Sequence, residues 1–437
     1  MYVEASPEEE GKVGTRRYKV PENRDRLFLA SCVALIVTSM TFAIRAGILT
    51  DLAVDFGLAD SELGWINSMA FYGFPVAMLV GGAVYNNVGP KVLLWVAFVS
   101  HIIGLVLTMM AGGFWGLIIS TFFIGFANGS VEAACNPLIA DMYPDKQTEM
   151  LNKFHVWFPG GTVIGSLIAF TLTGVVGWQV LIAIMIVPTI IYGVLILGQR
   201  FPKTENIIGD ISTNLSGIFT VLFVATALIM TMTATTEFGA TQWVERILGN
   251  AGANAMLLLA MTAGIMATGR FFAGPLIHRF NSVGVLICSA ILSAAGLYML
   301  SMVTGPLVYV GTAIFALGLC YFWPTMLGFT AEYIPKSGAL GLSLIGGAGM
   351  LGAGIWNPII GGWIDSGREA AYARGLEGAA AELATGQETL GSIAIFPTIL
   401  IPIFIILYFY IRGRKREVPA DEAVLNSDAM STPGSAR

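Results

Sequence analysis

The chain has 437 residues, of which 55% are hydrophobic and only 12% are charged. Soluble domains have about 25% charged residues, so this composition excludes an ordinary soluble domain and predicts a membrane protein. The net charge of −5 adds little, because the charged residues lie mostly in loops and tails. All four cysteines lie within apolar stretches, without disulfide or metal-ligand spacing. We expect no metal, no cofactor, no nucleic-acid partner and no enzymatic activity.

Twelve stretches are apolar over the roughly 20 residues that a membrane-spanning helix needs. In chain order they are residues 27–49, 63–85, 91–112, 114–141, 153–175, 178–198, 217–240, 253–277, 283–304, 306–330, 338–364 and 390–411. This predicts an all-α protein in which residues 27–198 and 217–412 form two bundles of six helices, joined by a linker at 199–216. The stretch DSGREAAYARGLEGAAAELATGQETLG is predicted to be one long outer loop between the last two spans.

The two ends of the chain are polar, and basic residues predict their side of the membrane. Segment 1–26 contains six Lys and Arg residues and lacks the order of a signal peptide. Segment 413–437 is predicted to be a disordered tail, and four basic residues lie where it joins the last span. The opposite side has only Arg246, Arg368 and Arg374. Because cytoplasmic loops are rich in Lys and Arg, both termini are predicted to be cytoplasmic. The protein itself is predicted to lie in the cell (inner) membrane.

The two halves of the chain repeat each other weakly. Gly47 in FAIRAGILTD corresponds to Gly239 in TATTEFGATQ, an offset of 239 − 47 = 192 residues, and the same offset relates Gly82 to Gly274. ADMYP after span four matches AEYIP after span ten, and PGGTVIG in span five resembles IGGAGMLG in span eleven. Internal symmetry of six-span halves is typical of secondary transporters whose binding site lies between the halves.

Several motifs resemble one transporter family. GGAVYNNVGPK (81–91) resembles the Gly-x-x-x-Asp-x-x-Gly loop of the major facilitator superfamily, with Asn86 in the Asp position; GPLIHRF puts His278 at the matching place. GSVEAACNPLIADMYP and LNKFHVWFPGGTVIGSL are similar to spans four and five of the fucose permease branch, the sugar–proton symporters. ATGRFFAGPLIHRF, TTEFGATQWV, YFWPTMLGFTAEY and NPIIGGWIDSG resemble its spans eight, seven, ten and eleven. The resemblance implies the major facilitator fold and alternating access. Gly47 stands where the branch's fucose permease has Asp.

Glu132 is the strongest candidate for coupling transport to a proton. It lies about 27 Å along span four from Phe114, in the inner half of the bilayer, where a charge costs about 2.5–3.5 kcal/mol. A desolvated carboxylate has a raised pKa, so it can bind a proton on one side of the membrane and release it on the other. A permanently neutral, hydrogen-bonded Glu132 is the alternative, and sodium stays open as the coupling ion.

A sugar site combines amides and carboxylates for hydroxyl groups with aromatic rings for C–H faces. Polar and aromatic residues within the spans supply candidates for such a site, although each could instead serve helix packing or hydrogen bonding. The candidates are Asn136, His155, Trp157, Glu237, Gln242, Trp243, Tyr321, Trp323 and Asn357. Arg270 is expected to bind loop carboxylates or carbonyls rather than substrate.

Arg45 and Glu237 are predicted to form an outer gate. Both lie near the outer ends of their spans, and they occupy equivalent repeat positions because 237 − 45 = 192. The alternative is that Glu237 binds sugar hydroxyls and Arg45 extends to the outer headgroups.

The main functional hypothesis is proton-coupled symport of a monosaccharide or similar polyol by a monomer in the lipid bilayer. The alternatives are a carrier of an anionic solute, such as a sugar acid bound by Arg45, and a non-transporting receptor.

Overall fold

The computed structural model describes residues 12–13, 16–17, 22–143, 147–202, 216–271 and 273–412. The predicted linker 199–216 and N-terminal segment 1–26 therefore lie largely outside the described residues, and the tail 413–437 lies wholly outside them. The side chains of Asn86 and His278, which the loop motif singled out, are also outside the description.

The described chain is almost entirely helical. The N-terminal half contains two-residue strands β1 (Lys12–Val13) and β2 (Arg16–Arg17), then helices α1 (Arg24–Gly47), α2 (Leu49–Phe56), α3 (Asp60–Met109), α4 (Phe114–Met142), α5 (Gln147–His155), α6 (Trp157–Leu172), α7 (Trp178–Ile184) and α8 (Ile186–Ile196). The C-terminal half contains α10 (Val221–Thr241), α11 (Val244–Leu248), α12 (Ala255–Phe271), α13 (Ala273–Leu300), α14 (Leu307–Leu319), α15 (Phe322–Tyr333), η3 (Pro335–Ser337), α16 (Gly338–Ala373), α17 (Gly378–Ile393) and α18 (Ile395–Arg412).

Eleven helical segments of the described chain are long and apolar enough to cross a membrane, and Ala255–Arg270 of α12 is a shorter apolar helix. Together they give the twelve spans that hydropathy predicted. The long outer loop predicted between the last two spans is wrong. In the structure α16 continues to Ala373, and α17 begins again at Gly378, so most of that polar stretch is helical. Its many Ala and Glu residues favour helix, although they are too polar to read as a span.

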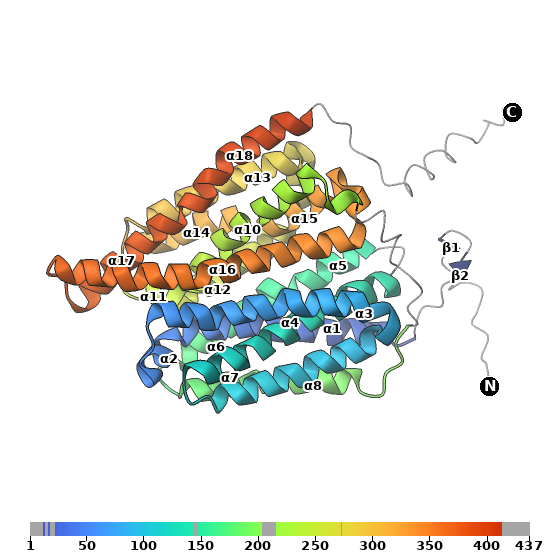
Figure 1. Ribbon diagram of the computed structural model, residues 1–437, viewed down its shortest axis with the longest axis horizontal. Coiled ribbons are helices and arrows are strands. Elements are labelled where there is room, and N and C mark those ends of the chain that lie inside the picture. The colour runs from blue at the N-terminus through green and yellow to red at the C-terminus, as the bar shows by residue number, and fades with distance from the viewer. Residues whose placement is uncertain are drawn as a thin grey trace.

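Figure 1 shows the two halves side by side, with the helix axes running roughly along the longest dimension of the molecule. We call the end where α1 begins and α18 ends the inner end, because the basic residues predict it to be cytoplasmic. The opposite end, which carries α2, α11 and α17, is the outer end (Figure 1). The halves meet mainly where α3 packs along α16 and α6 packs along α12.

The repeat is visible in the backbone. Gly89 has φ 76° at the kink between spans two and three, and Asn281 has φ 55° at the kink between spans eight and nine. These positions differ by 281 − 89 = 192, the offset found in the sequence. Glycine adopts this conformation without a Cβ clash. Asn281 is stabilised there by its side-chain Oδ1, which accepts a hydrogen bond from the Gly284 N–H at 2.9 Å.

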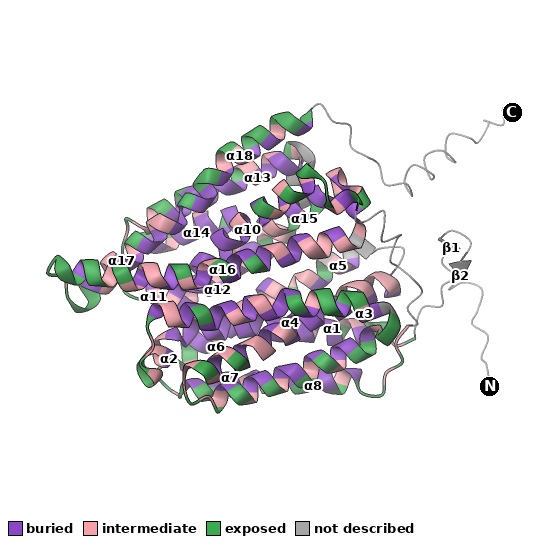
Figure 2. Cartoon of the chain, viewed as in Figure 1, coloured by how far each residue is buried: buried purple, intermediate pink, exposed green. Residues whose placement is uncertain are grey.

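The surfaces that face away from the other half carry exposed apolar side chains. Figure 2 shows exposed residues along α8 and α18 at the two flanks of the molecule. On α8 these include Val187, Ile190 and Val194, and on α18 Ile406 and Phe409, each about half exposed or more. Water would disfavour such large apolar surfaces, whereas the hydrocarbon of a bilayer accommodates them. This pattern fits a protein whose flanks contact lipid.

Candidate functional site

A cavity lies between the two halves near the middle of the molecule. It is formed by α1 and α6 from the N-terminal half and by α10 and α12 from the C-terminal half, and it contains about 430 Å³ of unfilled space including its opening. Its lining residues are Phe42, Ala43, Phe158, Pro159, Thr162, Glu237, Phe238, Thr241, Gln242, Leu259, Thr262, Ala263 and Met266. This is the position, at the interface of the repeats, where secondary transporters bind their solutes.

Glu237 and Gln242 supply the strongest polar groups of this central cavity. They lie on successive turns at the outer end of α10, and each is more than nine-tenths buried. Within the described residues no side chain donates a hydrogen bond to the Glu237 carboxylate. A buried carboxylate without a donor is costly, so Glu237 is a candidate acceptor for hydrogen bonds from outside the chain.

Phenyl rings from both halves form the apolar wall of the cavity. The centroid of Phe42 lies 5.9 Å from that of Phe238 and 6.3 Å from that of Phe158. Phe71 packs behind this wall without lining the cavity, with its centroid 5.1 Å from that of Phe238. Aromatic faces stabilise the C–H surfaces of a solute while neighbouring polar groups fix its orientation.

Arg45 connects the central cavity to the interior of the N-terminal half. Its Nη2 donates a hydrogen bond to Gln242 Oε1 at 3.1 Å, and its guanidinium carbon lies 5.1 Å from the centre of the Phe42 ring. Its Nε and Nη1 are buried and have no hydrogen-bond partner. Among the described residues no ion pair joins Arg45 to Glu237. The Arg45–Glu237 gate therefore stays a prediction, and in this conformation Arg45 contacts Gln242 instead.

A second polar group lies toward the inner end, within the N-terminal half. Glu132 Oε2 accepts a hydrogen bond from Asn136 Nδ2 at 2.7 Å and lies 3.5 Å from His155 Nε2. The Glu132 side chain is 10% exposed, whereas that of His155 is 42% exposed. His155 Nδ1 is hydrogen-bonded to the Leu151 carbonyl oxygen at 2.9 Å, which orients the ring. A buried carboxylate thus contacts a titratable group that reaches the surface.

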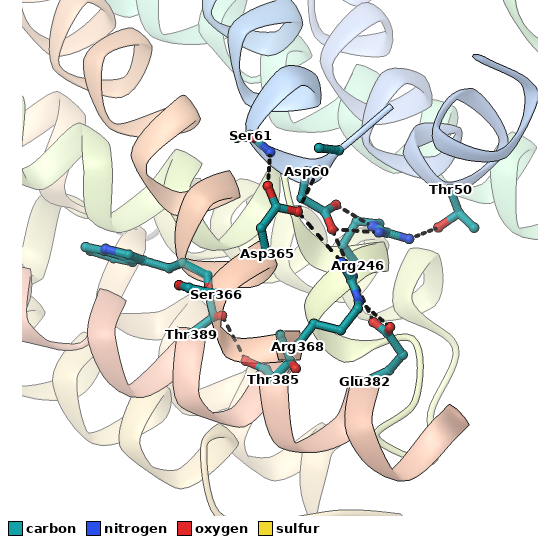
Figure 3. A network of polar contacts seen from close by, with 12 residues as sticks. Thr50, Asp60, Ser61, Arg246, Asp365, Ser366, Arg368, Glu382, Thr385 and Thr389 are labelled. Atoms are coloured by element: carbon teal, nitrogen blue, oxygen red, sulfur yellow. Dashed lines mark hydrogen bonds and ion pairs between the residues drawn. The ribbon is translucent and has the colours of Figure 1, made fainter. Parts of the chain in front are cut away.

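Charged residues join the two halves at the outer end, as Figure 3 shows. Asp60, at the start of α3, is fully buried and accepts two hydrogen bonds of 2.7 Å from Arg246 of the C-terminal half. Arg368 of α16 contacts the same carboxylate at 2.8 Å and also pairs with Glu382 of α17. We call Asp60, Arg246, Asp365, Arg368 and Glu382 the outer network.

Asp365 makes the outer network reciprocal. Its two carboxylate oxygens accept hydrogen bonds of 2.9 Å from the backbone N–H groups of Asp60 and Ser61 (Figure 3), so a side chain of α16 binds the N-terminus of α3. Backbones approach closely here, because a Cβ on Gly361 would lie only 2.2 Å from the Asp60 carbonyl oxygen. Burial has the largest single effect on the Arg246 pKa and lowers it. The hydrogen bonds to Asp60 and the negative charge of Asp60 together raise the pKa by more, so the net shift is upward.

The other predicted site residues lie in three different surroundings. Trp243 is fully buried, and its indole Nε1 donates a hydrogen bond to Asn357 Oδ1 at 3.0 Å, so this pair fastens α16 to the start of α11. The Tyr321 hydroxyl donates to the Gly269 carbonyl oxygen at 2.9 Å. Trp323 is half-buried with its ring centroid 6.5 Å from that of Phe238, and Trp157 is 42% exposed. None of these five predicted residues lines the central cavity in this conformation.

Arg270 contacts a carbonyl group, as expected, because its Nε donates a hydrogen bond to the Cys320 carbonyl oxygen at 3.0 Å.

The sequence patterns did not predict the phenylalanines of the cavity, because only Trp and Tyr were considered as aromatic ligands. Adjacency was an available signal, since Phe42 lies one turn before Arg45 and Phe238 directly follows Glu237. The patterns also did not predict the outer network, because Arg246 and Arg368 served only as indicators of membrane orientation.

The cavity between repeated halves points to a carrier, and comparison with known proteins identifies the family. Residues 29–242 match the family described as the Major Facilitator Superfamily. The chain is therefore similar to this family over nearly half of its length. The motif at 81–91 predicted this family, and the match indicates a transporter rather than an enzyme.

Solved transporters share the fold of this transporter over most of its length. A bacterial homologue of the human lysosomal transporter Spinster, in an inward-facing and unoccupied conformation, has a TM-score of 0.73 at 15% identity and covers 88% of this chain and 97% of its own. A D-xylose–proton symporter has a TM-score of 0.71 at 14% identity, covering 87% and 97%. The E. coli fucose:proton symporter has a TM-score of 0.56 at 18% identity, covering 87% and 99%. At these identities the likeness concerns the fold.

Relatives in sequence include carriers of different solutes. The cis,cis-muconate transport protein of Acinetobacter baylyi is 25% identical over 189 residues, which are 42% of this chain and 44% of that protein. Myo-inositol transporter 1 of Candida albicans is 24% identical over 197 residues, 42% of this chain and 36% of that protein. The chain thus spans less than half the length of these two relatives.

Proposed function

We propose that this transporter carries out proton-coupled symport of a monosaccharide or similar polyol through the central cavity. The observation that carries the proposal is the buried Glu237 carboxylate, without a donor among the described side chains, beside the Gln242 amide and the phenyl wall. A carboxylate accepts hydrogen bonds, and an amide both donates and accepts them. Hydroxyl groups on one edge of a solute and C–H groups on its face match this arrangement.

Threonine hydroxyls add to the polar side of the cavity. Thr162 of α6 and Thr262 of α12 lie on opposite sides of the interface, one in each half. Both donate their protons to backbone carbonyls of their own helices, at 3.1 Å and 2.9 Å, which leaves their oxygen lone pairs as acceptors. A cavity rich in acceptors favours a solute with several hydroxyl donors over one with none.

The Glu132, Asn136 and His155 cluster is proposed to carry the coupling proton. Protonation of Glu132 removes a buried charge, and release of the proton restores it at a cost that Asn136 and His155 reduce. His155 is partly exposed and lies 3.5 Å from Glu132, so a proton can pass between the two side chains directly. A relative named for myo-inositol supports a polyol as the solute.

A second candidate function is transport of an anionic solute with Arg45 as its ligand. The specific observation is that two of the three nitrogens of this buried guanidinium have no partner. Arginine binds carboxylates through paired N–H groups, and the relative named for cis,cis-muconate carries a dicarboxylate. The unpaired Glu237 opposes this candidate, because it would repel an anion in the same cavity unless it were protonated.

Uptake into proteoliposomes under an imposed pH gradient tests both candidates. Neutral sugars and polyols are compared with sugar acids and dicarboxylates, and each gradient is matched by a control with equal pH on both sides. We expect a neutral polyol to accumulate only with the gradient, and Glu237→Gln to weaken its binding about tenfold or more, because a charged hydrogen bond contributes about 1.5–3 kcal/mol. Accumulation of acids alone, abolished by Arg45→Gln, would establish the second candidate instead.

A further inference from the structure

A second cavity lies inside the N-terminal half, separate from the central cavity. It contains about 330 Å³ of unfilled space including its opening, and it is lined by α1, α2, α3, α4 and the junction of α7 with α8. Its polar lining residues are Thr41, Arg45, Thr108 and Thr121, and the others are Ile, Leu and Met. No Asp or Glu lines it. We call it the N-half cavity.

Arg45 brings an unbalanced positive charge into this cavity. Its side chain is 6% exposed, and Nε and Nη1 have no hydrogen-bond partner. Within the described part of the chain, no carboxylate lies at ion-pair distance from the guanidinium. Its one hydrogen bond goes to Gln242, an uncharged amide. A buried charge that is neither paired nor fully hydrogen-bonded is strongly destabilising, so this arrangement calls for a negative charge from outside the chain.

The hydroxyl groups of the cavity restrict where an anion would bind. The Thr41 hydroxyl donates to the Thr38 carbonyl oxygen at 2.6 Å, and the Thr108 hydroxyl donates to the Gly104 carbonyl oxygen at 2.7 Å. Their protons are therefore engaged. Within the described chain the Thr121 side chain makes no hydrogen bond, so its hydroxyl proton is available. Arg45 Nε, Arg45 Nη1 and the Thr121 hydroxyl are thus the donors that the cavity offers.

We propose that the N-half cavity binds a resident monovalent, weakly hydrated inorganic anion, of which chloride is the simplest example. One negative charge balances one guanidinium, whereas a divalent anion such as sulfate would leave an excess charge among aliphatic side chains. The Ile, Leu and Met walls favour an anion that loses its hydration shell easily. Water alone could satisfy the N–H groups, but it would leave the charge of Arg45 uncompensated.

Such an anion would influence the solute site through Arg45. The same residue lines the N-half cavity, has two unpartnered guanidinium nitrogens and donates a hydrogen bond from the third to Gln242 of the central cavity. Neutralising its charge weakens the attraction that it exerts on Gln242 and on any anionic group of a solute. The two cavities are therefore coupled through one side chain, whichever solute the central cavity takes. The proposal does not depend on the identity of that solute.

Thermal unfolding of the purified full chain, without solute, measures this binding. The protein is prepared in sulfate buffer, and chloride or bromide replaces sulfate at constant ionic strength. We expect the unfolding midpoint to rise with chloride and bromide and to saturate, because a ligand of the folded state stabilises it by mass action. Bromide is then located by anomalous diffraction, and we expect it beside Arg45 and Thr121.

Three variants separate this site from the central cavity. Thr121→Val should weaken the apparent chloride affinity about tenfold, through loss of one hydrogen bond to a charged group. Thr162→Val, the matched change in the central cavity, should leave the chloride response unchanged while it alters solute binding. Arg45→Gln should abolish the response and unfold at a higher temperature than the parent in sulfate. Equal stabilisation by chloride and sulfate, or bromide bound at Gln242 in the central cavity, would overturn the proposal without affecting the proposed solute.

Discussion

The two ends of the molecule hold their charged residues in opposite ways. At the outer end, Asp60 of one half binds Arg246 and Arg368 of the other, and Asp365 binds the backbone of α3 in return. At the inner end, Glu132 contacts Asn136 and His155 of its own half. In the described chain, every ion pair that joins the halves lies at the outer end, whereas the inner end leaves His155 42% exposed.

From this difference we infer different tasks for the two ends. The outer network must break if the halves separate there, so its strength sets how readily the outer end opens. The inner cluster can stay intact when the halves move, because its members belong to one half. A residue that carries a proton needs neighbours that stay in place while the halves move, as Glu132 has. Residues that close one end of the transporter need contacts that form and break between the halves, as in the outer network. The predictions below test this division, beginning with the largest effect.

Glu132→Gln is expected to abolish uptake that is driven by a pH gradient. The amide resembles the protonated carboxyl in shape but binds no coupling proton, so accumulation should fall to the level without a gradient. Exchange of solute between compartments of equal pH should survive. Both are measured in proteoliposomes, with Glu62→Gln, a carboxylate at the outer end of α3, as the control. Accumulation at the normal level in Glu132→Gln would remove this residue from the coupling mechanism.

Asp60→Asn is expected to open the outer end. The change leaves two arginines without their shared carboxylate, and breaking a buried pair costs about 3–5 kcal/mol, which is a shift of about a hundredfold or more in the equilibrium. Spin labels on Val54→Cys of α2 and Tyr372→Cys of α16, both exposed positions in opposite halves, report the separation. We expect a longer distance to become dominant.

Glu388→Gln provides the matched control for Asp60→Asn. The Arg374–Glu388 pair also lies at the outer end, but it joins two helices of the same half and both side chains are about half exposed. An exposed pair contributes at most about 1 kcal/mol, so the distance between the spin labels should not change. The exposed Cys288 is replaced by Ser in all variants. If Asp60→Asn left the distances as they are in the parent, the outer network would not be the seal.

Glu245 is expected to give the smallest effect, a change of stability with pH. Burial raises its pKa above the usual 4.5, although the hydrogen bond from Thr50 and the charge of Arg246 oppose this. Between about 4.5 and the raised pKa, the folded state binds more protons than the unfolded state. Glu245 therefore adds stability as the pH falls through its folded pKa, and reduces it at higher pH.

The measurement is the thermal unfolding midpoint of the parent and of Glu245→Gln between pH 7 and pH 4. Other carboxylates titrate in both proteins, so the difference between the two curves isolates Glu245. We expect Glu245→Gln to be the more stable protein at pH 7 and its advantage to shrink as the pH falls. A constant difference across the range would show that Glu245 titrates normally.

Hydropathy was sufficient to find the twelve spans, because the bilayer requires about 20 apolar residues whatever the neighbouring helices are. The repeat was also visible in the sequence, since the 192-residue offset of the glycines returns in the backbone at Gly89 and Asn281. Hydropathy failed between α16 and α17, where Ala and Glu continue the helix beyond the apolar part of the span. The length and polarity of a segment predict the part of a helix that lies in the membrane. They do not predict where that helix ends in water.

Local spacing also predicted one contact of the site. Glu132 and Asn136 are four residues apart, so a helix places them on one face, and the structure joins them at 2.7 Å. The contact of Glu132 with His155 and that of Arg45 with Gln242 needed the packing of separate helices. The repeat offset suggested Glu237 as the partner of Arg45. It could not show that Arg45 contacts Gln242 instead, which lies just over one helical turn from Glu237.

The sequence by itself determined that this chain spans a membrane as twelve helices in two repeated halves and which charges lie inside them, because apolar length, helical spacing and the cost of a buried charge are local properties. Only the tertiary structure decided which charges meet. Asp60 and Asp365 are 305 residues apart in the chain and in contact in the fold. Two nitrogens of Arg45 have no hydrogen-bond partner because no acceptor from another described helix packs against them. Such contacts depend on how the two halves pack, and no local pattern specifies that.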